Sequence, residues 1–157
     1  MKEYKVGIIG GTGMVGQRFI TLMEHHPWFR LTVIAASARS ARKPYGEAAE
    51  KRWVMPSPIP ACARDLVVMD AVADAEKIAS LVDFCFCAVD MPKGEIRALE
   101  ERYARLECPI VSNNSAHRWT EDVPMVVPEI NPEHLAVIPY QRKRLGTERG
   151  FIAVKSN

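Results

Sequence analysis

Three glycines near the N-terminus have the spacing of a phosphate-binding turn. Gly10, Gly13 and Gly16 lie in the run GGTGMVGQ, after a short apolar segment and before an amphipathic one. In such a turn one glycine permits the bend, one lets the backbone approach a pyrophosphate, and one lets helix and strand pack closely. The N–H groups at the start of the following helix then attract the phosphates. This strand–turn–helix context predicts dinucleotide binding, with a purely structural turn as the alternative.

The residues after the second apolar segment indicate which dinucleotide to expect. An NAD-binding fold usually ends its second strand with Asp or Glu, about 20 residues past the glycine turn, to hold the ribose 2′-hydroxyl. Here residues 35–40 read AASARS, and the next acid is Glu47. Ser37, Arg39 and Ser40 could hold a 2′-phosphate through charge-assisted hydrogen bonds, whereas a carboxylate would repel it. We therefore predict NADP as the cofactor, with a solvated basic loop as the alternative.

The elements that must position these residues follow from the hydrophobic periodicity. Short apolar runs predict strands over residues 5–9, 31–36, 66–69, 83–89, 109–112, 125–127 and 151–154. Apolar stripes at helical spacing predict a helix from Val15 that Pro27 ends, and a second helix over residues 93–107. Residues 37–65 are expected to form a long connection with a short helix near 47–53, and residues 140–150 a linker or an exposed helix end. Strands that alternate with helices predict an α/β fold with a doubly wound, mostly parallel, Rossmann-like sheet.

Composition sets broad limits on the class of protein. With 157 residues, 48% apolar and 25% charged, the chain is typical of a globular domain rather than of a disordered, collagen-like or coiled-coil protein. The formal charge of +2 is too balanced to argue for nucleic acid, and no apolar run approaches the roughly 20 residues of a membrane span. Without a signal peptide the expected location is the cytoplasm. Four cysteines without a CxxC pair are expected to be small buried hydrophobic residues rather than metal ligands: Cys62, Cys85, Cys87 and Cys108.

Several segments taken together resemble one family. In chain order they are GGTGMVGQRF, ASARSARKPYGEA, DFCFCAV, VSNNSAHR, EDVPMVVPEINPEHL and GFIAVKSN. Over essentially its whole length the chain resembles aspartate-semialdehyde dehydrogenase of the archaeal and fungal type. The resemblance implies an NADP-binding Rossmann domain over residues 1–150, and a strand over 151–157 that leads into a C-terminal domain for catalysis and dimerisation. It also implies reductive dephosphorylation of L-4-aspartyl phosphate to L-aspartate 4-semialdehyde, a step towards lysine, methionine, threonine and isoleucine.

The resemblance also assigns roles to individual residues. The family nucleophile is a cysteine directly after an Asn, in a motif similar to PNCS or SNCS, so it would follow Asn157. The resemblance makes Asn157 a catalytic candidate, whose amide could help to polarise the carbonyl. None of the four cysteines of this chain inherits that role, and the chain alone is expected to be inactive. The implied contacts are Gly10, Thr12, Gly13, Met14 and Val15 with the pyrophosphate; Ser37, Arg39 and Ser40 with the 2′-phosphate; the backbone of Cys87 and Ala88 with the adenosine; Ser112, Asn113 and Asn114 below the nicotinamide; and Arg118 with the substrate phosphate.

Other interpretations of these residues and of the whole chain stay open. Arg118 could form a surface salt bridge, Asn113 and Asn114 could be turn formers, and Asn157 could be a disordered chain end. Malonyl-CoA reductase and N-acetylglutamyl-phosphate reductase would share the glycine turn and a reaction through a cysteine thioester. A non-catalytic NADP-binding module is a third possibility. The expected partners are a small-molecule substrate and, for a full-length form, a second copy in a homodimer or homotetramer. Nucleic acid, a membrane and a metal are not expected.

Overall fold

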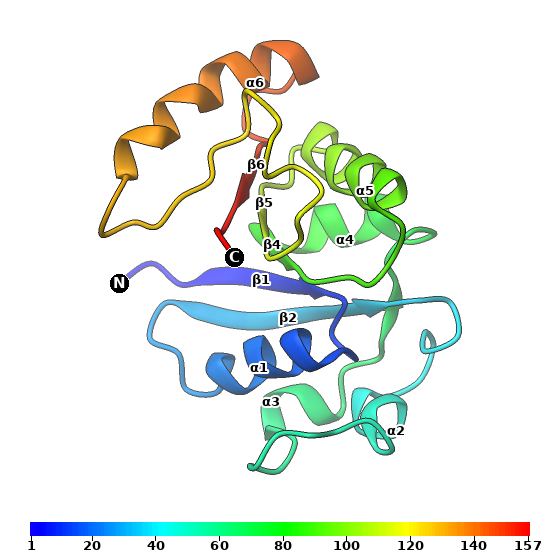
Figure 1. Cartoon of the computed structure of the whole chain (residues 1–157). Helices are drawn as coiled ribbons and strands as arrows, with labels where there is room; N and C mark the ends of the chain where they lie inside the picture. Colours follow the sequence, from blue (N-terminus) through cyan, green and yellow to red (C-terminus); the bar gives the residue numbers. More distant parts are fainter.

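Six parallel strands form the centre of the structure, which is a computed structural model describing residues 1–157 (Figure 1). The strands are β1 (Tyr4–Ile9), β2 (Phe29–Ala36), β3 (Met69–Asp70), β4 (Phe84–Cys87), β5 (Ile110–Ser112) and β6 (Ile152–Val154). Their order across the sheet is β3-β2-β1-β4-β5-β6. The chain therefore builds outward from β1 in both directions, and the order reverses between β1 and β4. The predicted doubly wound, Rossmann-like sheet is confirmed.

Helices cover both faces of this sheet (Figure 1). One face carries α1 (Met14–Met23), α2 (Tyr45–Ala49) and α3 (Ala61–Arg64), and the other carries α4 (Ala75–Leu81), α5 (Lys93–Arg105) and α6 (Ile138–Leu145), which follows a 3₁₀ helix over Pro132–Val137. Successive side chains of β1 point to opposite faces of the sheet. Ile8 packs in the core on the α1 side, and Ile9 packs in the core on the α5 side. Each strand of the centre is thus buried on both sides.

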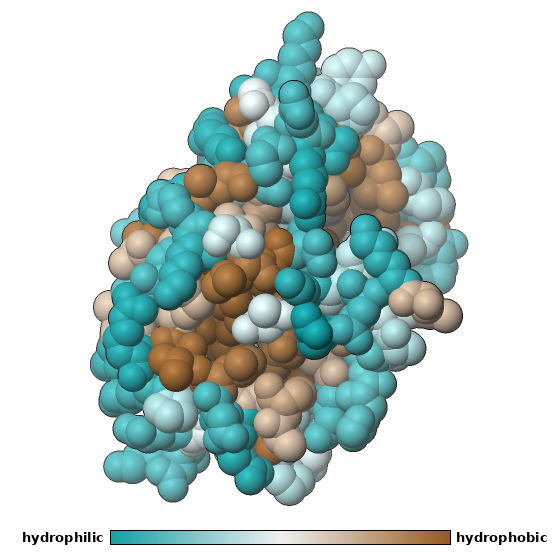
Figure 2. All heavy atoms as spheres, turned by 180° about the vertical axis from the view of Figure 1, so that it is seen from behind, coloured by the Kyte–Doolittle hydropathy of each residue, from teal (hydrophilic) through white to brown (hydrophobic).

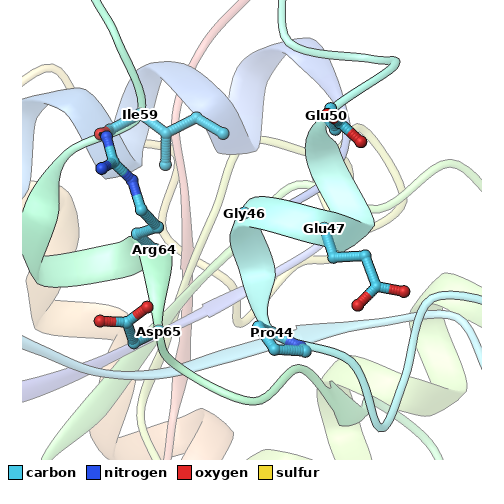
Figure 3. A pocket seen from close by; sticks show the side chains of 7 residues that line it. All are labelled: Pro44, Gly46, Glu47, Glu50, Ile59, Arg64 and Asp65. Carbon is cyan, nitrogen blue, oxygen red and sulfur yellow. The ribbon is translucent and has the colours of Figure 1, made fainter.

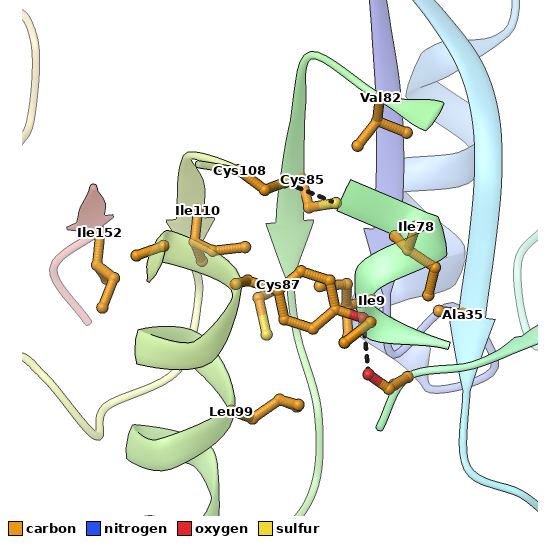
Figure 4. Close-up of a cluster of buried hydrophobic side chains, with 14 of the residues drawn as sticks. Ile9, Ala35, Ile78, Val82, Cys85, Cys87, Leu99, Cys108, Ile110 and Ile152 are labelled. Atoms are coloured by element: carbon orange, nitrogen blue, oxygen red, sulfur yellow. Dashed lines mark hydrogen bonds between the residues drawn. The ribbon is translucent and has the colours of Figure 1, made fainter. Parts of the chain in front are cut away.

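The larger core cluster lies between the sheet and α4 and α5 (Figure 4). The Tyr103 hydroxyl donates to the Ala71 carbonyl at 2.6 Å, and the sulfur atoms of Cys108 and Cys85 are 3.8 Å apart. These two cysteines and Cys87 are buried, as predicted, whereas Cys62 is exposed on α3. Cys62 corrects the expectation of four buried cysteines: the short helix that carries it turns this position outward.

Two predicted strands differ from the structure. The third lies at Met69–Asp70 rather than 66–69, because residues 67 and 68 pair antiparallel with 42–44 instead: the Arg42 amide donates to the Val68 carbonyl at 2.8 Å. Residues 125–127 form only an isolated bridge to β6. There the Asn131 side chain accepts from the Val127 amide at 2.8 Å and ends the pairing.

The connections contain helices that periodicity did not indicate. In the long connection after β2, the short helix lies at Tyr45–Ala49 rather than 47–53, and α3 is an additional turn. The polar segment expected as a linker contains α6, which ends at Gly146 with φ +72°. The buried Gln141 side chain holds α6 to β6, since it accepts from the Ile152 amide at 2.7 Å.

The surface is hydrophilic with local apolar areas. Figure 2 shows one such area, ringed by hydrophilic side chains, on the face opposite the view of Figure 1. The most exposed large apolar side chains of the second half of the chain are Trp119, Ile130 and Tyr140. No helix combines the length and apolar character that crossing a membrane requires.

Candidate cofactor-binding site

A cavity of about 610 Å³ opens at the edge of the sheet where β1, β2, β3 and β4 end. In a doubly wound sheet this edge, next to the reversal of strand order, is where ligands bind. Four separate stretches of the chain line the cavity, together with Arg52. They are Gly10, Thr12 and Gly13; Ala36, Ser37, Ala38 and Arg39; Asp70, Ala71 and Val72; and Ala88, Val89, Asp90 and Met91.

The glycine turn has the backbone geometry that its spacing predicts. Gly10 has φ +91°, and a Cβ there would lie 2.1 Å from the Ala88 carbonyl oxygen, so the turn passes directly against the end of β4. A Cβ on Gly16 would lie 2.1 Å from the Gly10 carbonyl oxygen, so α1 packs against its own turn. A Cβ on Gly13 would meet nothing closer than 3.7 Å. Close backbone contacts therefore require glycine at positions 10 and 16. At position 13 the absence of a side chain leaves the backbone open to the cavity.

The first turn of α1 offers unpaired donors beside this opening. Gly13 caps the helix without a side-chain hydrogen bond, and its amide donates to the Gly10 carbonyl at 3.3 Å. The amides of Met14, Val15 and Gly16 have no acceptor within the chain. Unpaired amides at a helix start bind anions, because the helix dipole adds partial positive charge. The turn therefore has the shape and the donors for a pyrophosphate. Met14 and Val15, for which we predict a pyrophosphate contact, are the first two residues of α1.

Two buried side chains hold the turn from behind. Gln17 donates to the carbonyls of Thr12 at 3.0 Å and Arg52 at 2.8 Å, and accepts from the Val54 amide at 3.0 Å. The Tyr45 hydroxyl donates to the Gly11 carbonyl at 2.7 Å, and burial raises the pKa of this phenol. These contacts fix the turn and tie the segment around residue 52 to it.

The three residues predicted for the 2′-phosphate are not equivalent. Ser37 and Arg39 are exposed and line the cavity. Ser40 is buried, and its amide closes a turn by donating to the Ser37 carbonyl at 2.9 Å. Arg42 is held by Asp74 in a bidentate pair at 2.7 and 2.9 Å, whereas the Arg39 guanidinium has no acceptor within the chain. Arg39 is therefore a cation in the cavity lining that is free to bind an anion, as is Arg52.

Three charged residues of the cavity were missed from the sequence: Arg52, Asp70 and Asp90. Asp70 is the last residue of β3 and Asp90 follows β4, and the rule that parallel strands end at one edge could have found them. Asp70 Oδ1 accepts from the amides of Val72 and Ala73, both at 2.9 Å, so part of its charge is neutralised locally. No sequence signal marks Arg52, because the fold of the long connection alone brings it to the cavity.

The residues predicted beyond β4 and β5 continue this edge of the sheet. Ala88 lines the cavity, while the Cys87 side chain points into the core and burial raises its thiol pKa. The Asn113 amide donates to the Cys87 carbonyl at 2.8 Å, which joins the ends of the two strands. Ser112 is buried and Asn114 is half-buried next to it. These residues lie outside the cavity lining, on the β5 side of the strand-order reversal.

Arg118 and Asn157 lie near the ends of β5 and β6. The Arg118 guanidinium donates from Nε to the Lys155 carbonyl at 3.2 Å and from one terminal nitrogen to the Asn113 carbonyl at 3.1 Å. It forms no ion pair, so the surface salt bridge considered from the sequence is not present. Its other terminal nitrogen has no acceptor within the chain. Asn157 is exposed and without regular structure.

A second hollow of about 510 Å³ lies between α2 and α3 and is separate from this site (Figure 3). Its lining comes only from residues 44–65, and it contains neither the glycine turn nor a strand end. Glu47, Glu50 and Asp65 bring three carboxylates against the single guanidinium of Arg64. That balance of charge does not suit a dinucleotide phosphate.

Comparisons with known proteins agree with this description. The family model described as "Semialdehyde dehydrogenase, NAD binding domain" matches residues 5–138. Aspartate-semialdehyde dehydrogenase of Archaeoglobus fulgidus is 41% identical over 155 residues, covering 99% of this chain and 43% of that protein. The enzyme of the same name from Methanothermobacter thermautotrophicus is 43% identical over 152 residues, covering 97% of this chain and 41% of that one.

Among solved structures, the chain is similar to aspartate-semialdehyde dehydrogenase with NADP from Candida albicans. The TM-score is 0.84 at 34% identity, with 99% of this chain and 43% of that chain covered. The chain thus spans about two fifths of the length of these relatives.

Proposed function

The chain belongs to the semialdehyde dehydrogenase family as its NAD-binding domain, and on that premise we propose that it is the NADP-binding part of an aspartate-semialdehyde dehydrogenase. One observation carries this proposal: the glycine turn and the unpaired Arg39 line the same cavity at the reversal of strand order, and the unpaired amides of the first turn of α1 lie next to the glycine turn. The similarity to a relative whose structure contains NADP supports it. The reaction proposed for the whole protein is reductive dephosphorylation of L-4-aspartyl phosphate.

The preference for NADP over NAD depends on the charges around β2 and β3. Ser37 and Arg39 follow β2 where an NAD-binding fold would place an acid. Asp70 is an acid that lines the same cavity as Ser37 and Arg39. One of its carboxylate oxygens already accepts from the amides of Val72 and Ala73. A 2′-phosphate would thus meet a free guanidinium and a hydroxyl. A guanidinium–phosphate hydrogen bond is about twice as strong as a neutral one.

In the proposed reaction L-4-aspartyl phosphate and NADPH, with a proton, give L-aspartate 4-semialdehyde, phosphate and NADP. NADPH supplies the hydride when it is bound. The residues of this chain bind and orient: the glycine turn would hold the pyrophosphate, Ser37 and Arg39 the 2′-phosphate, and residues 112–114 the nicotinamide end. We assign the nucleophile to no residue of the chain, since Cys85, Cys87 and Cys108 are buried and Cys62 lies on α3, away from the cavity.

Arg118 is proposed to bind the substrate phosphate. Two of its five N–H groups are used by the carbonyls of Lys155 and Asn113, which fix the plane of the guanidinium. The remaining N–H groups could donate to a phosphate next to the ends of β5 and β6. The same two hydrogen bonds join the loop after β5 to the segment after β6. Arg118 would therefore bind the phosphate and also hold these two segments together.

A chimera tests the proposed function directly. Residues 1–157 would be joined to the remaining length of the archaeal relative that covers 99% of this chain. With aspartate semialdehyde, phosphate and NADP, the chimera should form NADPH, and Arg39→Ala in the chimera should raise the KM for NADP. A folded chimera that forms no NADPH under these conditions would contradict the proposal.

The assembly state is part of the same proposal. Trp119, Ile130 and Tyr140 expose 91%, 76% and 72% of their surface after β5. We propose that other protein covers these side chains in a full-length form, as it covers the contiguous apolar patches that mark protein interfaces. We expect a full-length form to be a homodimer or homotetramer, which sedimentation equilibrium of the chimera would measure. A monomeric chimera would contradict this part.

A further inference from the structure

Glu100 is a buried carboxylate on α5, directly beneath the loop that follows β5. It exposes 1% of its surface, and its Oε1 accepts from the Ser112 hydroxyl at 2.7 Å and from Asn114 Nδ2 at 3.1 Å. A buried carboxylate is unfavourable unless hydrogen bonds compensate it. Both compensating donors come from the loop proposed to lie below the nicotinamide, so the carboxylate and this loop are joined.

The contacts close into a ring of hydrogen bonds. The Asn114 backbone amide donates to the Ser112 hydroxyl at 3.0 Å, this hydroxyl donates to Glu100, and the Asn114 side-chain nitrogen donates to the same carboxylate oxygen. The Asn114 nitrogen also faces the Cys87 sulfur at 3.4 Å. Burial raises the pKa of the Glu100 carboxyl, and its Oε1 is the acceptor of both contacts, so it holds the side-chain nitrogen of Asn114 inward.

The ring leaves one polar atom of Asn114 outside it. Its Oδ1 has no partner within the chain and is not among the buried unpaired atoms, so it is open to solvent. Asn114 follows β5, on the other side of β1 from the Ser37 and Arg39 loop. A dinucleotide that spans the reversal of strand order, with its 2′-phosphate near Arg39, places its nicotinamide on this β4–β5 side. The carboxamide of a nicotinamide has N–H donors and needs an acceptor there.

We propose that Glu100 is a positioning residue, which holds the Asn114 amide nitrogen inward so that Oδ1 accepts a hydrogen bond from the carboxamide of the bound nicotinamide. The inference rests on the proposed NADP-binding function. In this proposal Glu100 on α5 does not touch the nicotinamide itself. It fixes the orientation of the Asn114 side chain, which does.

Positioning and stability can be separated at this residue. The second carboxylate oxygen, Oε2, is buried without a partner. Glu100→Met removes this unpaired oxygen, but it also leaves the Ser112 hydroxyl and the Asn114 nitrogen without their acceptor, so the variant is expected to be less stable than the parent. Circular dichroism verifies that it is folded before its affinities are compared. Glu100→Met removes the acceptor and keeps the volume. Glu100→Gln keeps an oxygen that can accept from Ser112 and Asn114.

The test compares three probes on the 157-residue chain by calorimetry: NADP, its nicotinic acid analogue, and adenosine 2′,5′-bisphosphate. The analogue replaces the carboxamide by a carboxylate, which cannot donate and is repelled by Oδ1. The parent chain should bind NADP about tenfold more tightly than the analogue. With the analogue, the hydrogen bond to Asn114 Oδ1 is lost and its carboxylate is repelled by that oxygen. Glu100→Met should reduce this ratio to about twofold or less, and Glu100→Gln should retain it.

The bisphosphate lacks the nicotinamide. If Glu100 had a purely structural role, its replacement would change the affinity for the bisphosphate as well. Its affinity should stay within about twofold of the parent in both variants. Glu95→Met, at an exposed position on the same helix, is the matched control and should change none of the three affinities. An unchanged NADP-to-analogue ratio in folded Glu100→Met, or no discrimination by the parent chain, would overturn the inference. A parent chain that binds neither NADP nor the bisphosphate would instead contradict the proposed function.

Discussion

Replacing Gly16 by alanine should destabilise the chain through the glycine turn. A Cβ at this position would lie 2.1 Å from the Gly10 carbonyl oxygen and 2.8 Å from the Gly11 Cα, and both contacts are with backbone. Overpacking typically costs about 1–3 kcal/mol and sometimes more, and backbone atoms cannot rotate away as a side chain can. Alanine regains up to about 1 kcal/mol of helix propensity. The expected net loss is about 2 kcal/mol, or roughly 4–8 °C in Tm for a chain of this size.

Gly94 provides the matched control. It lies in the first turn of α5, and a Cβ there would meet nothing within 4 Å. Gly94→Ala should therefore stabilise the chain by about 0.5–1 kcal/mol and raise Tm by roughly 1–4 °C. Thermal unfolding followed by circular dichroism measures both variants, and NADPH affinity should fall in Gly16→Ala alone. A Gly16→Ala variant at least as stable as the parent would refute the close packing of α1 against its turn.

Two further changes test the site, and a third tests how stability depends on pH. Arg39→Ala should weaken NADPH by about 1.5–3 kcal/mol, roughly 10–150-fold, and leave NADH nearly unchanged by calorimetry; equal weakening of both nucleotides contradicts a 2′-phosphate contact. Arg118→Lys loses the planar fork that donates to Asn113 and Lys155, so the chimera should show a raised KM for phosphate, and unchanged phosphate kinetics would remove Arg118 from the site. Burial holds the pKa of His117 below its ordinary value of 6.5, so the stability gained from the neutral ring is complete above about pH 6.5 and is lost as the pH falls through the folded-state pKa. His117→Gln should flatten this acid-side loss of Tm, and an identical pH profile would show that the ring does not contribute.

The parts predicted from the sequence are those fixed by local patterns. The patterns that mark the glycine turn, β1 and α1 all lie within the first 23 residues, and spacing alone indicates them. The apolar stripe of α5 was likewise visible. Element type was therefore predictable wherever an element carries its own periodicity.

The parts that were missed depend on contacts between distant segments. Helices α3 and α4 are only four and seven residues long, too short to show an apolar stripe. The position of β3 is shifted by the antiparallel contact of residues 67 and 68 with the segment after β2. Short elements of this kind are decided by tertiary packing rather than by their own propensity.

The same distinction applies to the site. Ser37 and Arg39 follow a strand that the sequence predicts, so their place at the edge could be inferred. Arg52 reaches the cavity through the fold of the long connection after β2, where Gln17 donates to its carbonyl. Glu100 sits next to Glu101 in a charged helix and looks like another surface acid in the sequence. Its burial is visible only when α5 is packed on β5.

The most direct test of the account is a calorimetric titration of the 157-residue chain with NADPH and, separately, with NADH. The glycine turn and the Arg39 loop are complete within the chain and open into one cavity. We predict one site per chain that binds NADPH at least about tenfold more tightly than NADH, the scale of one charge-assisted hydrogen bond to the 2′-phosphate. Equal affinity for the two nucleotides, or no binding of NADPH by the folded chain, would contradict the central claim.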